Sequence, residues 1–134
     1  MTLTSFDDLL HTARQQPQPQ RLLFVFAGTS LPADADAAQR ERFAAGQGGE
    51  LAPLMCVDKT PDELGGFSAL AEESRQFGQD WVIVFVAALD GRNGLAPSSE
   101  EASVPLQRMV ESIKVGSIAA FMPFDRQGQP VQFE

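Results

Sequence analysis

Apolar residues gather in three runs along the chain, and each run predicts a β-strand. The runs cover residues 21–27, 51–57 and 81–89. From Leu22 to Ala27 every residue is apolar, and the third run is similar. Such continuous apolarity, rich in branched and aromatic side chains, is typical of strands that are covered on both faces.

Between and before these runs the apolar residues recur at helical spacing. Phe6 is followed by Leu9, Leu10 and Ala13, which predicts a first helix with Thr4 or Ser5 as its N-cap. An Ala-rich polar segment, residues 35–45, predicts a short exposed helix that ends at glycines. We therefore expect helices to alternate with the first strands.

Two further helices are predicted in the second half of the chain. Thr60, Pro61 and Glu63 form a capping-box pattern, and the helix after it is expected to restart at Phe67, because two glycines interrupt it. Residues 105–115 carry the most regular amphipathic pattern, and Pro105 is expected in the first turn of that helix.

The chain end predicts a hairpin, and the whole pattern predicts a fold class. Residues 118–124 and 130–133 flank a turn, and Pro123 and Pro130 favour the edge of a sheet. Helices that alternate with doubly buried strands predict an α/β sandwich. We expect one domain over residues 1–134, with a mainly parallel, mixed sheet of about five strands and a C-terminal edge hairpin.

Composition narrows the class of protein. The net charge is −8, which disfavours nucleic-acid binding, because phosphate neutralisation needs a basic face. The first residues do not resemble a signal peptide, and the longest apolar run, residues 81–89, is too short to cross a bilayer. The lone Cys56 has no disulfide partner and suits a reducing compartment. We expect a cytoplasmic protein that binds neither nucleic acid nor membranes.

Polar residues follow each strand, and they form the candidate ligand site. If the strands are parallel, their carboxyl ends meet at one rim. The residues expected there are Thr29, Ser30, Asp58, Lys59, Asp90, Arg92 and Asn93. If these residues have a function, they would form a small anion site, with Lys59 and Arg92 supplying the positive charge. The preferred interpretation is that turn chemistry alone explains these residue types.

Nucleophiles, bases and metal ligands are scarce. His11 lies off the apolar stripe of its helix, so we expect it to be exposed and without a catalytic role. Cys56 is expected to be a buried, inert thiol within a strand. One cysteine and one histidine do not supply the usual zinc ligands. We expect no catalytic residue, no metal and no other cofactor.

Several stretches resemble a known family. They include residues 5–10, 22–28, 53–59, 105–110 and 123–131. Together they resemble a family of small proteobacterial proteins often labelled "ribonucleotide reductase subunit alpha". The resemblance spans essentially the whole chain and implies no catalytic residues. Cys56 alone cannot supply the radical cysteine and redox cysteine pair of a reductase catalytic subunit, so the residues do not support that label.

Two functions of different classes remain. The first is a non-catalytic binding or regulatory module for a protein partner or a small ligand. Its interface would be the C-terminal hairpin, residues 117–133, which could also join two copies of the chain. The second is a small enzyme or an accessory protein of nucleotide metabolism that binds an anionic substrate at the rim of strand ends.

Overall fold

The computed structural model of the protein describes residues 5–30, 36–44, 50–76 and 81–131, without the side chains of residues 29, 30, 42–44 and 50. The elements in chain order are α1 (Phe6–Arg14), β1 (Gln20–Ser30), α2 (Ala37–Ala44), β2 (Glu50–Lys59), a short 3-10 helix (Pro61–Glu63), α3 (Phe67–Arg75), β3 (Ile83–Asp90), α4 (Ser99–Lys114) and β4 (Met122–Phe124). None of the described helices is long and apolar enough to span a membrane.

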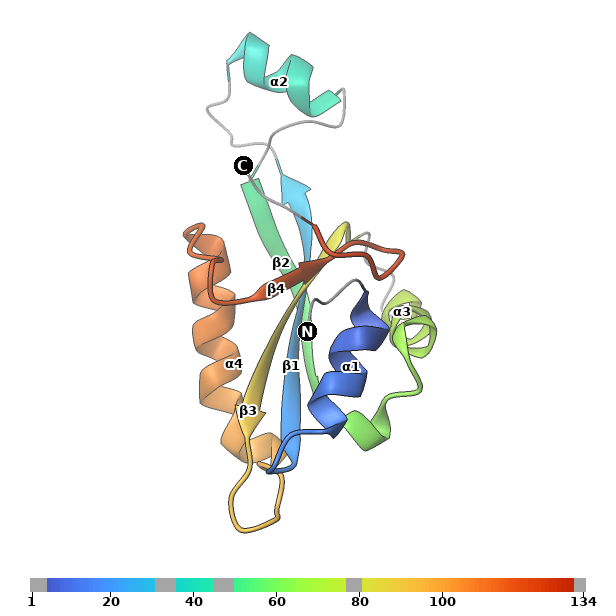
Figure 1. The fold of residues 1–134 in the computed structure, drawn as a ribbon. Coiled ribbons are helices and arrows are strands. Elements are labelled where there is room, and N and C mark those ends of the chain that lie inside the picture. Colours follow the sequence, from blue (N-terminus) through green and yellow to red (C-terminus); the bar gives the residue numbers. More distant parts are fainter. Residues whose placement is uncertain (1–4, 31–35, 45–49, 77–80, 132–134) are drawn as a thin grey trace.

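The described strands form one sheet in the order β2-β1-β3-β4, and every neighbouring pair is antiparallel. The expected mainly parallel sheet of about five strands is therefore wrong. The class remains α/β, because helices cover both faces of this four-stranded sheet (Figure 1).

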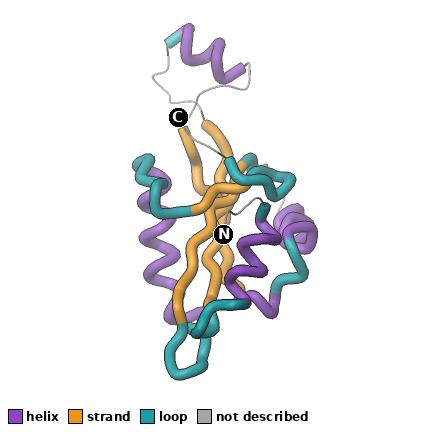
Figure 2. The backbone as a smooth tube through the Cα atoms, viewed as in Figure 1, coloured by secondary structure: helices purple, strands orange, loops and turns teal. Residues whose placement is uncertain are grey.

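The error comes from the segment that links β1 to β2. A helix between two buried strands suggests a crossover to a parallel neighbour, but α2 projects beyond the end of the sheet, and the chain returns along β1 as a hairpin (Figures 1 and 2). β2 and β3 do run in the same direction, because both are antiparallel to β1. They are not neighbours, since β1 lies between them.

The sheet separates two apolar cores. On one face, α1 and α3 cover Leu22, Phe24 and Phe26 of β1, and the Phe6 ring packs edge-on against Phe124 with 5.5 Å between centroids. On the other face, α4 packs against alternate residues of β1 and β3. Burial on both faces explains why β1 and β3 are apolar along most of their length.

Helix α4 begins earlier than expected. Its N-cap is Ser98, whose Oγ accepts from the Glu101 backbone N–H at 3.0 Å, while Glu101 Oε1 accepts from the Ser98 N–H at 3.2 Å. This capping box places Pro105 inside the helix and not in its first turn. The helix tolerates the proline at the loss of one backbone hydrogen bond.

Strand β2 lies at one edge of the sheet, and this position explains the exposure of Cys56. The prediction that Cys56 is buried is wrong, because the residue is exposed.

The pairing of β1 with β2 shifts between Phe26 and Ala27, which leaves Leu54 without a partner in β1. Such a bulge, together with Pro53, interrupts the outer edge of β2.

Candidate functional site

The antiparallel sheet divides the seven predicted site residues between its two ends. Thr29 and Ser30 pair with Leu51 and Glu50, at the end of the sheet from which α2 projects. Asp58 pairs with Leu23, near the opposite end of β1. The expected convergence of all three strand ends on one rim does not occur, because β1 runs against β2 and β3.

Asp58 faces α4 and is held in a closed polar cluster. Its Oδ1 accepts from Arg21 Nη1 at 2.6 Å and from Ser99 Oγ at 2.6 Å. Arg21 also donates from Nε to the Pro97 carbonyl at 2.5 Å. Both charged side chains are largely covered, at 14% and 16% exposure. This ion pair fixes the start of α4 against the sheet, which is a structural task that leaves Asp58 little access to a ligand.

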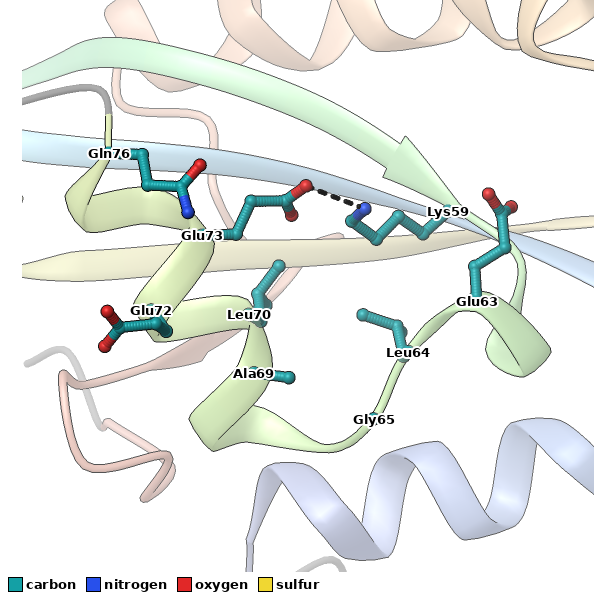
Figure 3. Close-up of a pocket in the computed structure, with 9 residues that line it drawn as sticks. All are labelled: Lys59, Glu63, Leu64, Gly65, Ala69, Leu70, Glu72, Glu73 and Gln76. Carbon is teal, nitrogen blue, oxygen red and sulfur yellow. Dashed lines mark hydrogen bonds and ion pairs between the residues drawn. The ribbon is translucent and has the colours of Figure 1, made fainter.

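Lys59 lies on the opposite face of the sheet and lines a hollow of about 440 Å³ beside α3. Its Nζ donates to Glu73 Oε1 at 3.0 Å. Figure 3 shows these two side chains reaching toward one another, while the Glu72 carboxylate points away. Glu63, Glu72 and Glu73 all line this hollow beside the single Lys59, so its charge is unfavourable for an anion.

Glu63 closes the turn that follows β2. Its Oε1 accepts from the Thr60 N–H at 2.8 Å and from Thr60 Oγ1 at 2.9 Å. These hydrogen bonds to the backbone and the hydroxyl hold the pKa of Glu63 below its usual range. The predicted capping box is confirmed, although the helix it begins is only the single 3-10 turn.

Asp90, Arg92 and Asn93 line one hollow together, and its volume is about 440 Å³. Asp90 Oδ1 accepts from Gln20 Nε2 at 2.7 Å. Arg92 and Leu95 exchange backbone hydrogen bonds around Asn93 and Gly94, both of which have positive φ. This is the geometry of a tight hairpin turn, so turn chemistry accounts for Asn93 and Gly94.

Sequence reasoning missed an open stretch of sheet edge. β4 pairs with β3 only from Val84 to Val86. The following residues of β3, Ala87–Asp90, have no strand on their outer side in the part of the chain that the structure describes, and we call them the open edge. Figure 1 shows β4 crossing beside one half of β3 only. Sequence carries no direct signal for this edge, because it depends on where β4 stops.

An apolar groove runs beside the open edge, and we call it the α1 groove. Its volume is about 190 Å³, and it is lined by Leu9, Thr12, Ala13, Gln16, Gln20, Leu22, Val86, Ala87, Ala88 and Met122. These residues come from α1, β1, β3 and β4. Met122 is exposed over 37% of its surface and adds a large apolar side chain to the rim of this groove. The groove therefore presents apolar surface next to unpaired backbone.

The remaining titratable residues form no obvious catalytic centre among the described residues. His11 is exposed, as predicted, and its Nε2 lies 3.1 Å from Gln15 Nε2. Desolvation and the negative charge of Asp58 raise the pKa of Cys56. No three His, Cys, Asp or Glu side chains of the described part lie together as a metal site would require.

Comparison of this chain with protein-family models, curated proteins and solved structures finds no match.

Proposed function

We propose that the protein is a non-catalytic binding module of the cytoplasm, and that its ligand is a partner protein bound at the open edge and the α1 groove. One observation carries this proposal, namely the apolar groove that lies beside the open edge, which no described strand covers. Unpaired strand edges and exposed apolar surface are the features by which sheets recruit another chain.

The ion pairs of Asp58 and Lys59 support this choice. Asp58 is neutralised by Arg21, and Lys59 by Glu73, so neither charge needs a ligand. The C-terminal segment contributes to the proposed interface through Met122. Phe124, at the other end of β4, is 1% exposed and serves the core instead.

Site-specific photo-crosslinking in cells tests this function. A photoreactive phenylalanine analogue replaces Met122, and a control protein carries it at Val104, which is 55% exposed on α4. We expect one protein adduct from position 122 and none from position 104. The absence of any adduct at position 122, with a monomer by light scattering, contradicts a protein partner. An adduct of twice the chain mass indicates a second copy.

A second candidate function, the binding of an anionic metabolite such as a nucleotide, rests on Arg92, which lines a hollow together with Asp90, Asn93 and Glu101. Arg92 makes no ion pair within the described residues, so its charge is available. A thermal-shift screen with nucleotides tests this alternative, since a ligand at a hundredfold excess over its Kd adds about 2.7 kcal/mol to stability. A true ligand of this hollow loses its shift in Arg92→Ala but keeps it in the control Arg40→Ala.

A further inference from the structure

We propose that the open edge binds an extended segment of the partner as an added β-strand, and that one large apolar side chain of this segment occupies the α1 groove. This inference rests on the proposed function and specifies how the partner is held and what chemistry it must have. Main-chain hydrogen bonds would supply affinity, and the groove would supply specificity.

The backbone orientation of β3 follows from the position of Pro123. The Pro123 carbonyl accepts from the Val131 N–H at 3.0 Å, on the side away from β3. Residues of an antiparallel strand alternate in the side to which their N–H and C=O point. Since Pro123 pairs with Phe85, the backbone N–H and C=O groups of Val84 and Val86 are the ones that point toward β4. Two and four residues beyond Val86, Ala88 and Asp90 turn their backbone groups toward the open side.

The groove lies on the face to which an added strand would direct alternate side chains. Ala88 pairs with Leu22 on β1, so both side chains lie on the α1 face of the sheet. A residue placed opposite Ala88 in a new strand would point to this same face, into the groove. A volume of about 190 Å³ suits a single leucine or phenylalanine side chain.

The other outer edge of the sheet is protected. β2 has no strand on its outer side among the described residues, but it carries Pro53, which lacks a donor, and the bulge at Leu54. Lys59 is the last residue of β2. Proline, bulges and lysine are the means by which edge strands avoid pairing with other chains. The open edge of β3 has none of these features between Ala87 and Leu89.

The occupant is a different protein and not a second copy paired through the same edge. A symmetric partner would place its own Ala88 or Asp90 opposite the groove. A methyl group leaves the groove unfilled, and a carboxylate loses its hydration there. Asp90 and Arg92 contribute one charge of each sign near the open edge, so the net charge of −8 sets the electrostatic preference. We therefore infer a segment in which leucine or another large apolar residue alternates with lysine or threonine.

Peptide binding to the purified full chain tests this inference. The probe is a nine-residue amidated peptide in which leucine alternates with lysine and threonine. The control peptides have the same composition with the leucines in one block, or alanine in place of every leucine. We expect micromolar binding of the alternating peptide in fluorescence anisotropy, and slowed hydrogen exchange at the Ala88 and Asp90 amides. Weaker binding by both controls is expected.

Variants at Ala88 distinguish binding as an added strand from apolar association without backbone pairing. Ala88→Pro removes the outward donor, and Ala88→Leu fills the groove from within, while Ala88→Ser keeps the backbone donor and the open space. Proline is tolerated at a strand edge whose N–H faces solvent, and circular dichroism checks the fold. We expect the first two variants to weaken binding by about tenfold or more and the serine variant to match the wild type.

Three results would overturn the inference that the partner binds as an added strand. Failure of the alternating peptide to bind at about 1 mM, protection of amides elsewhere, or unchanged binding by Ala88→Pro and Ala88→Leu overturns it. Crosslinking at position 122 then judges the proposed function separately. If the cellular adduct persists in the Ala88→Pro protein, a partner exists but is not held as an added strand.

Discussion

Glu63 is a single residue whose ionisation supports the end of β2. Its pKa lies below the usual range, because the carboxylate accepts two hydrogen bonds from Thr60. A lowered pKa means that this stabilisation is present above the ordinary value of about 4.3 and is lost as the pH falls through the lowered pKa. The side chain is 53% exposed, so solvent screening keeps the contribution small.

We expect Glu63→Gln to reduce the free energy of unfolding by about 0.5 kcal/mol at pH 7, and the loss to vanish in acid. Urea denaturation of both proteins across this pH range measures the difference. Glu72→Gln is the control, because Glu72 lies on the surface and forms an ion pair with Arg75. An equal loss in acid and at neutral pH would mean that the carboxylate charge plays no part.

Cys56 is exposed, yet we expect its thiol to react slowly. Desolvation of the thiol and the nearby Asp58 charge raise its pKa, so less thiolate is present at a given pH. We expect iodoacetamide to alkylate the native protein more slowly than the urea-unfolded protein near pH 8, and the two rates to converge at higher pH. Mass spectrometry follows the labelling. A native rate equal to the unfolded rate near pH 8 contradicts the raised pKa.

At the scale of a single element, Pro105 led to a wrong prediction of where α4 begins. Pro105 is typical of a first turn, but the capping pair Ser98 and Glu101 sets the start of the helix at Ser99, six residues before the proline. The structure uses the earlier start, which also brings Ser99 to Asp58. The proline is accommodated because the apolar stripe of α4 remains buried on both sides of it.

The early start of α4 predicts the effect of removing its cap. Ser98→Ala should lower the free energy of unfolding by about 1 kcal/mol, because the Glu101 N–H loses its acceptor. Ser103→Ala, at an exposed position inside the helix, should be neutral or slightly stabilising. Chemical denaturation of the two variants measures both effects. A neutral Ser98→Ala would place the start of the helix at Pro105 instead.

At the scale of the whole molecule, the sequence revealed the elements better than their arrangement. Burial on both faces produces the same apolar run in a central antiparallel strand as in a parallel one. The pattern of residues 22–27 therefore locates β1 but not the direction of its neighbours. The segment that contains α2 has the length of a crossover, and only its projection beyond the sheet shows that it closes a hairpin (Figure 1).

The candidate site depended on that missing direction. Lys59 and Arg92 were identified as strand-end residues, but β1 lies between their strands, and the two residues line separate hollows. The open edge is set by the three-residue length of β4, and the groove by how α1 lies over β3. Both depend on contacts between distant segments, which no local pattern of residues encodes.

The C-terminal turn joins distant parts of the chain into one core. The Gly128 carbonyl accepts from the Phe6 N–H at 2.8 Å, which ties the turn to the start of α1. Gly128 has a φ of 79°, and an added Cβ would lie 2.9 Å from Cγ of Phe67 in α3. The turn is therefore seated on the aromatic cluster at a distance that only glycine permits.

We expect Gly128→Ala to lower the free energy of unfolding by about 2–4 kcal/mol, because a left-handed backbone and a displaced Phe67 ring add their costs. Gly94→Ala is the matched control: its φ is 77°, and nothing lies within 4 Å of an added Cβ. This control should lose only about 1 kcal/mol, the backbone cost alone. Urea denaturation compares the two. Equal losses would show that the turn is not packed on Phe67.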